Sequence, residues 1–298
     1  MSEFTSLSGY GFDHRGAFLR LDHHENNAIQ REHFYLVNQS FTLKKELGRY
    51  CTGQFDLKTL EDDVCPNAAE LLSPKANVCF DCFDFIGFNP AFYHLEQHQI
   101  SPQQRAYNQT NHVVYLAYFA PGLVKVGISS EARKEHRWKE QGARWVAHIY
   151  TVENAYEARH IEEKISSKLK LPEVILGKKK RDLLTVQLHE NEVKSEFFEL
   201  MNQIDGLFEH KVNRERIFDM EAFYNPDRVP LATTIIDVSE HSEGKISGKC
   251  IGLYGDLVVF ENKGQQFMCS LKKLISYKVS FSEEEEKVDF EPQQISLF

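Results

Sequence analysis

The chain has 298 residues, of which 42% are hydrophobic and 27% are charged, and a normal globular core can be built from this composition. No run reaches the roughly eighteen consecutive apolar residues of a membrane span, and the first five residues lack the basic start and apolar stretch of a secretory signal. We therefore expect a cytoplasmic protein with no membrane partner. In that reducing compartment its six cysteines favour metal ligation over a disulfide scaffold.

The charges are distributed unevenly along the chain. The formal net charge of −9 argues against a protein that coats polyanions indiscriminately. Residues 112–182, however, hold 14 Lys and Arg against 9 Asp and Glu, whereas residues 1–111 hold 9 against 14 and the last eighteen residues hold 1 against 6. Contacts with phosphate are therefore expected in the middle of the chain.

The first hundred residues are short alternating runs separated by turn formers, which predicts a β-rich domain over residues 1–105. This segment contains the C-x-x-C pair Cys79 and Cys82, together with the single cysteines Cys51 and Cys65. Because thiolates in a tetrahedral array select zinc, we predict one structural zinc held by all four. The alternative is a set of buried thiols plus a redox C-x-x-C.

The middle of the chain has the clearest pattern of secondary structure. Residues 113–119 and 123–128 are apolar runs on either side of an Ala-Pro-Gly turn, which predicts a β-hairpin. The charged segment 131–141 stops at a glycine, as a helix does. Residues 145–152 form the next predicted strand, and apolar residues recur at helical spacing over residues 158–169. The predicted order is β-β-α-β-α.

Three further segments complete the predicted α+β fold. An amphipathic helix after Asn191 extends the middle domain, which we place at residues 112–225. Residues 229–281 alternate glycines with short β-prone runs, which predicts a small β-barrel-like domain. Residues 282–298 include four consecutive glutamates and predict a flexible acidic tail.

The middle domain resembles the GIY-YIG nuclease superfamily. The resemblance rests on the element order together with Tyr115 on the first strand, Gly127 on the second, an arginine on the first helix and Glu162 on a later one. It implies hydrolysis of phosphodiester bonds with Mg²⁺ or Mn²⁺ bound at Glu162. The wider chain resembles an uncharacterised prokaryotic family known only as a domain of unknown function, which shares the cysteine-containing front part and the glycine-rich end.

The nuclease resemblance also implies roles for neighbouring side chains. Tyr115 would hold or deprotonate the attacking water. Lys125 stands where the family has its second tyrosine, and it would lower the pKa of Tyr115 or neutralise phosphate charge. Arg133 and Arg137 are alternatives for the catalytic arginine. The candidates for supporting the phosphate or the backbone are Gly127, Ser129 and His136.

The position of Glu162 favours a site independently of the resemblance. It borders the apolar stripe of its predicted helix, and a carboxylate at a buried edge is costly unless it is paired or metal-bound. A single carboxylate that acts with waters and phosphate suits Mg²⁺. The alternative for Glu162 is an ordinary exposed glutamate. The alternative for Arg133 and Arg137, four residues apart, is a solvated helix face rather than a phosphate grip.

The last five residues carry a separate signal. Gln-Ile-Ser-Leu-Phe at residues 294–298 resembles the peptide by which bacterial replication and repair enzymes dock on the DNA polymerase sliding clamp. In this interpretation Leu297 and Phe298 anchor in an apolar pocket of the clamp, and Gln294 supplies polar specificity. The alternative is that these residues fold back onto the body of the protein.

Together, these signals predict a metal-dependent endonuclease that cleaves DNA in repair or replication-associated processing and is tethered to the sliding clamp. The alternative is a non-catalytic, zinc-containing nucleic-acid-binding module that retains the GIY-YIG-like fold. A protein directed to RNA, whose clamp-like tail is accidental, is a third possibility. The sequence names neither the preferred nucleic acid, nor the oligomeric state, nor the role of residues 229–281.

Overall fold

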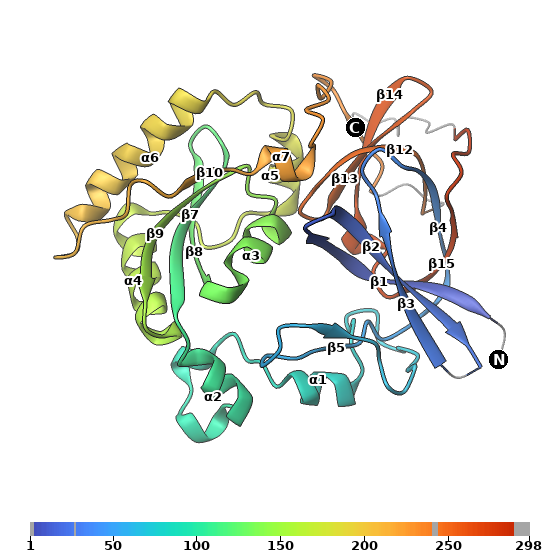
Figure 1. The fold of residues 1–298 in the computed structure, drawn as a ribbon, viewed down its shortest axis with the longest axis horizontal. Helices are drawn as coiled ribbons and strands as arrows, with labels where there is room; N and C mark the ends of the chain where they lie inside the picture. Colours follow the sequence, from blue (N-terminus) through green and yellow to red (C-terminus); the bar gives the residue numbers. More distant parts are fainter. Residues whose placement is uncertain (1–2, 27, 240–243, 289–298) are drawn as a thin grey trace, which may run out of the picture. The chain divides into compact units, whose positions relative to one another are not determined.

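The computed structural model describes residues 3–26, 28–239 and 244–288, and Figure 1 shows its ribbon. The described chain has a mixed α/β fold, as the sequence predicts, and it divides into two compact units. The first unit comprises residues 1–53, 64–79 and 224–298, and the second comprises residues 54–63 and 80–223. None of the helices in the described part of the chain is both long and apolar enough to cross a membrane.

A nine-stranded sheet forms the body of the first unit. Its strands lie in the order β11-β14-β13-β12-β4-β15-β1-β2-β3, and neighbours run antiparallel except for β11 and β14. Buried side chains from strands near both ends of the chain, such as Leu7, Phe41 and Phe260, supply its core. The strands are β1 (Phe4–Asp13), β2 (Gly16–Glu25), β3 (Ala28–Tyr35), β4 (Ser40–Arg49), β11 (Ile236–Asp237), β12 (Lys245–Tyr254), β13 (Leu257–Asn262), β14 (Gln265–Ser270) and β15 (Tyr277–Ser282).

The two ends of the chain share this sheet. Figure 1 shows the blue N-terminal strands together with the orange and red C-terminal strands, and β4 pairs with both β12 and β15. The structure therefore differs from the expected separate domains at residues 1–105 and 229–281. Alternation of apolar residues indicates that a segment forms a strand, but it does not indicate which other strand pairs with it. Thr42 and Ser247, whose hydroxyls hydrogen-bond across β4 and β12, are 205 residues apart in sequence.

The acidic segment after β15 is also held more closely than the expected flexible tail from residue 282. The Thr42 hydroxyl donates to the backbone oxygen of Glu284 at 2.7 Å, and the Asn262 amide donates to that of Glu286 at 2.9 Å. Lys245 forms an ion pair with the Glu286 carboxylate. These side chains satisfy backbone groups that would otherwise need water, and composition alone does not reveal them.

The second unit contains a four-stranded antiparallel sheet in the order β10-β9-β7-β8. The predicted order β-β-α-β-α is present as β7-β8-α3-β9-α4. The strands are β7 (His112–Ala120), β8 (Leu123–Ser130), β9 (Trp145–Val152) and β10 (Ile217–Asp219), and the longer helices are α3 (Lys134–Gln141), α4 (Ala155–Leu169) and α6 (Glu190–Asp205).

The central strand β7 is buried along its whole length, so its two faces meet different layers. Val114, Leu116 and Tyr118 lie in one core cluster with residues of α4 and α6. On the opposite face, Tyr115 makes an edge contact with Trp138 of α3. Figure 1 accordingly shows α3 on one side of this sheet and α4 on the other. Helix α3 ends at Gly142, whose φ of +67° is the left-handed conformation that glycine adopts readily.

Short elements complete the chain. A small hairpin of β5 (Gln54–Phe55) and β6 (Asp62–Asp63) contacts α1 (Phe80–Ile86) within the second unit. The remaining helices are α2 (Pro102–Asn108), α5 (Gly177–Asp182) and α7 (Glu221–Tyr224), with short 3₁₀ turns η1 (Phe92–His94), η2 (Gln97–Gln99), η3 (Glu131–Arg133) and η4 (Leu271–Lys273).

Candidate functional site

The four predicted cysteine ligands come together. The sulfur atoms of Cys51, Cys65, Cys79 and Cys82 all lie within 4.8 Å of one another, and all but Cys79 are buried. A tetrahedral site with zinc–sulfur bonds of about 2.3 Å has sulfur–sulfur edges of about 3.8 Å. Cys65 Sγ and Cys79 Sγ are 3.9 Å apart. The cluster can therefore hold a metal ion, and its size and donors are consistent with zinc.

Backbone N–H groups prepare this cluster for charged sulfur. The Cys79 N–H donates to Cys51 Sγ at 3.2 Å, and the Gly53 N–H donates to the same sulfur at 3.5 Å. Such bonds stabilise a thiolate over a thiol. The loop is tied to the sheet because Arg31, which pairs with buried Asp22, also donates to the backbone oxygen of Thr52. Four protein ligands leave no open position, which is the arrangement of a structural site.

The other two cysteines have a different environment. Cys250 and Cys269 lie in β12 and β14 and are buried in the nine-stranded sheet. Burial raises the pKa of the Cys250 thiol to about 12, so this side chain stays protonated near neutral pH. It serves as a matched control for the cluster.

We predict one zinc per chain for the wild-type protein and loss of most of it in Cys79→Ser, because three thiolates bind zinc less tightly than four. Cys250→Ser should keep the wild-type content. Elemental analysis of the purified, dialysed proteins gives the ratio. Equal zinc in wild type and Cys79→Ser would contradict a four-thiolate site.

A second group of polar side chains surrounds Tyr115 on β7. Tyr115 lies opposite Gly127 of β8, and a Cβ atom added at Gly127 would be 2.8 Å from both the Tyr115 hydroxyl and Cζ. The glycine therefore makes room for the tyrosine ring over β8. A larger residue at position 127 would therefore clash with the Tyr115 ring. Gly127, which was expected from the sequence to support the site, does so by leaving space for that ring.

The Tyr115 hydroxyl is fully enclosed but not isolated. Gln141, at the end of α3, donates its side-chain N–H to the hydroxyl oxygen. Burial raises the pKa of Tyr115, whereas the nearby Arg137 guanidinium and the Gln141 hydrogen bond act in the opposite direction. The net rise keeps Tyr115 a neutral hydroxyl at physiological pH, able to donate one hydrogen bond and to accept others.

Lys125 lies two residues before Gly127 on β8. Its ammonium donates to the backbone oxygen of Glu173 at 2.9 Å. Burial and the positive charge of Arg137 lower the pKa of Lys125 to about 8, with the carboxylates of Glu162 and Glu173 acting in the opposite direction. Lys125 is therefore a cation that loses its proton close to the physiological range.

Glu162 is buried on α4, only 6% exposed, and it is paired. Arg159 Nη1 donates to Glu162 Oε2 at 2.7 Å and to Glu173 Oε2 at 3.0 Å. Burial raises the pKa of Glu162, and Arg159 and Lys125 oppose that rise. The hydrogen bond from Arg159 engages Oε2 and leaves Oε1 for another ligand. Neither Arg159 nor Glu173 was among the predicted site residues, although the i, i+3 spacing of Arg159 and Glu162 is a usable signal.

The structure distinguishes the two candidate arginines. Arg133 bonds to Glu140 at 3.2 Å, and its guanidinium lies over the ring of Phe55, 4.4 Å from the centroid. Arg137 is half exposed and acts on the pKa values of both Tyr115 and Lys125. Arg137, not Arg133, therefore belongs to the Tyr115 group.

Among the described residues, no hydrogen bond links the other two candidates, Ser129 and His136, to the Tyr115 group. Ser129 pairs with Val113 at the end of β8, and His136 is exposed on α3.

A run of four cations adjoins the Tyr115 group. Helix α5 carries Lys178, Lys179, Lys180 and Arg181 in succession. The Lys180 ammonium donates to the backbone oxygen of Gln141 at 2.6 Å, and Gln141 is the residue that binds the Tyr115 hydroxyl. The sequence indicated the basic character of residues 112–182 but not that this run borders Tyr115.

Comparison with known proteins assigns the chain to a family. The family described as "Protein of unknown function (DUF2797)" matches residues 54–279, more than half of the 298-residue chain. The chain belongs to DUF2797. No curated protein and no solved structure matches it. The matched region of this DUF2797 chain includes the Tyr115 group and three of the four clustered cysteines, whereas the clamp-like peptide, residues 294–298, lies beyond the match and outside the described residues.

Proposed function

We propose that the protein is a metal-dependent endonuclease that cleaves DNA, with its reactive centre at the Tyr115 group. The observation that carries the proposal is the convergence of Tyr115, Lys125, Arg137 and Glu162. The charges of Arg137 and Glu162 act in opposite directions on the pKa values of both Tyr115 and Lys125. They come from β7, β8, α3 and α4, in the element order on which the resemblance to GIY-YIG nucleases rests.

The residues of the group suit hydrolysis of a phosphodiester. Arg137 is half exposed and can bind a phosphate oxygen, where it would stabilise the charge that develops during attack. Lys125 adds a second positive charge on the same side of β8 as Gly127. Tyr115, as a neutral hydroxyl, retains its O–H proton and can donate it to a water or to a phosphate oxygen. The position of its ring is fixed by Gly127 and Trp138.

Glu162 can bind a divalent cation if waters and substrate phosphate oxygens supply the other ligands. Among the described residues, the cysteine cluster is the one place where three or more metal-ligating side chains meet. An ion at Glu162 therefore needs waters and substrate phosphate oxygens for most of its coordination, which is how Mg²⁺ is commonly bound. Arg159 fixes the carboxylate so that Oε1 remains for the ion. When bound, Mg²⁺ or Mn²⁺ supplies a Lewis acid and lowers the pKa of a coordinated water.

The charge around the site favours a polynucleotide substrate. Lys180 of α5 lies next to Gln141 and carries the run of four cations in that helix towards Arg137 and Lys125. A stripe of cations on an otherwise acidic chain attracts a phosphate backbone to one place. The assignment to DNA rather than RNA rests on the clamp-like peptide.

We expect Glu162→Gln to lose metal-dependent cleavage by about a hundredfold or more, because the substitution removes the ionised ligand. Glu163→Gln, the same change at the next residue, which is exposed, should cleave like the wild type. The assay uses Mg²⁺ or Mn²⁺ with single-stranded, duplex and branched DNA and with RNA.

The outcomes separate the two functions. Cleavage that survives in Glu162→Gln would contradict the assigned site. If the wild type cuts no substrate but still binds DNA, the protein is instead a non-catalytic zinc-containing nucleic-acid-binding module. Preferential cleavage of RNA would reassign the substrate.

We expect DNA affinity to fall as the pH rises from 7 to 9, because Lys125 loses its positive charge as the pH passes through about 8. Loss of one phosphate contact weakens binding roughly fivefold at about 0.15 M salt. Lys125→Arg stays charged over this range and should bind with much less pH dependence. Fluorescence anisotropy with a labelled duplex measures both. The same pH dependence in the two proteins would remove Lys125 from the DNA interface.

We expect the last five residues to bind the bacterial sliding clamp. Leu297→Ala combined with Phe298→Ala should abolish retention of the protein on immobilised clamp, because buried apolar anchors dominate such peptide interfaces. Phe290→Ala, which removes an aromatic ring upstream of the motif, should be retained like the wild type. Retention of the double variant at the wild-type level would sever the proposed link to replication and repair.

A further inference from the structure

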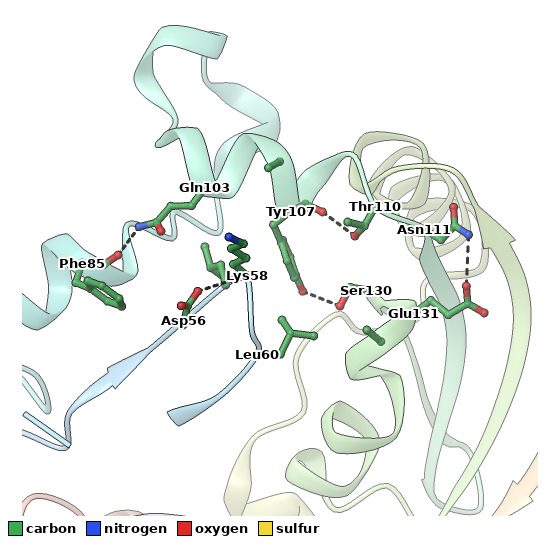
Figure 2. A pocket seen from close by; sticks show the side chains of 13 residues that line it. Asp56, Lys58, Leu60, Phe85, Gln103, Tyr107, Thr110, Asn111, Ser130 and Glu131 are labelled. Atoms are coloured by element: carbon green, nitrogen blue, oxygen red, sulfur yellow. Dashed lines mark hydrogen bonds between the residues drawn. The ribbon is translucent and has the colours of Figure 1, made fainter. Parts of the chain in front are cut away.

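A pocket of about 760 Å³ lies in the second unit, away from the Tyr115 group. Figure 2 shows that it is enclosed by the loop that carries Asp56, Lys58 and Leu60, by Phe85 and Tyr107, and by Ser130 and Glu131 at the end of β8. Leu57, Ala106 and Ala132 add further apolar surface. This volume is typical of a ligand site, and it has room for several large apolar side chains.

Apart from the Lys58 ammonium, the side-chain N–H and O–H donors that line the pocket are largely used within its wall. The Tyr107 hydroxyl donates to Ser130 Oγ at 3.0 Å, and the Gln103 amide donates to the backbone oxygen of Phe85. The Asn111 amide donates to Glu131 at 3.5 Å. These donors are thus used inside the wall, as the dashed lines of Figure 2 show. Asp56 Oδ1 accepts from the backbone N–H of Lys58 at 2.6 Å, and the Lys134 ammonium is 3.7 Å from Glu131 Oε1. A carboxylate has about four acceptor positions, so both groups can accept further bonds, which favours a ligand with an apolar body and N–H donors.

Leu60 has an unusual backbone conformation for a residue that lines the pocket. Its φ of +64° is in the left-handed region, where a branched apolar side chain is disfavoured and asparagine or glycine is tolerated. Its side chain nevertheless lines the pocket. Leu60 lies in the turn between β5 and β6, where its N–H donates to the backbone oxygen of Asp56. A strained residue whose side chain also lines a cavity is a feature that recurs at binding sites.

The charge around the pocket indicates which ligand. Residues 54–63 carry four acidic residues against one lysine, and residues 80–88 carry Asp81 and Asp84 with no basic residue. On the same helix, Phe80 and Phe83 are 79% and 63% exposed, so the apolar surface continues outside the pocket. Acidic segments repel a phosphate backbone. They also repel the protein's own C-terminal segment, since residues 283–291 hold six acidic residues and one lysine.

We propose that this pocket binds a peptide segment of a protein partner, one in which large apolar side chains stand next to lysine or arginine. The apolar side chains enter between Leu60, Phe85 and Tyr107, and the basic groups meet Asp56 and Glu131 at the edge. This mode uses apolar anchors for affinity and charge for specificity. It is separate from cleavage at the Tyr115 group.

The test selects random twelve-residue peptides displayed on phage against the immobilised full chain. Synthetic, labelled copies of the enriched peptides are then measured by fluorescence anisotropy. We expect apolar residues flanked by Lys or Arg, and binding at least about tenfold weaker in Leu60→Asn. Because asparagine tolerates a positive φ, the thermal midpoint of Leu60→Asn should equal or exceed that of the wild type.

Two further variants make the result specific. Leu72→Asn, the same change at a 96% exposed leucine outside the pocket, should bind the peptides like the wild type. Glu162→Gln should also bind them normally, even if it does not cleave DNA. Absence of enrichment, enrichment of acidic peptides, or peptides that bind Leu60→Asn as tightly as the wild type would overturn the proposal. Displacement of the peptides by a single-stranded oligonucleotide that itself depends on Leu60 would make the pocket a nucleic-acid site instead.

Discussion

The carboxylate of Glu162 is buried on α4, and a buried charge without a partner is costly. The second unit therefore needs cations around it. Arg159, three residues before Glu162 on the same helix, supplies one of them, and Lys125 on β8 supplies another. The burial of Lys125 depends in turn on the carboxylates of Glu162 and Glu173. Arg137 and Tyr115 lie within the same electrostatic field. The packing of the sheet against its helices and the chemistry of the proposed site therefore rest on the same few groups.

The two units differ in the size of their sheets and in where their polar side chains gather. The first unit is built on a large nine-stranded sheet and supplies three of the four clustered thiolates, those of Cys51, Cys65 and Cys79. The second unit has the smaller sheet and concentrates its polar side chains at Tyr115 and at the pocket beside Leu60. Both of these places depart from ordinary packing. At Tyr115 a hydroxyl and several charges are enclosed, and at Leu60 the backbone is strained.

Local patterns in the sequence were sufficient for part of this structure. The hairpin before Ser130, the helix that stops at Gly142 and the grouping of the four cysteines follow from turn residues, apolar periodicity and thiolate chemistry. The partners of Glu162 were less accessible. Lys125 was a candidate through the nuclease resemblance, and Arg159 is signalled by helical spacing, but nothing in the sequence indicated Glu173, which follows α4 in the chain. The choice of Arg137 over Arg133 depends on the direction of each side chain, which i, i+4 spacing does not give. The pocket depends on tertiary packing and on an unusual backbone angle at Leu60, for which the sequence offers no sign.

The interleaving of the first and last strands in one sheet has a consequence for biosynthesis. Strand β4 is made early, yet the strands on both sides of it, β12 and β15, leave the ribosome only after residues 54–223 have been synthesised. During most of synthesis the nascent chain therefore exposes unpaired strand edges, which are prone to associate with other chains. The β7–α6 segment has its partners close in sequence and can fold first. Completion of the large sheet, and release of a fully paired chain, must await the arrival of residues beyond Tyr277.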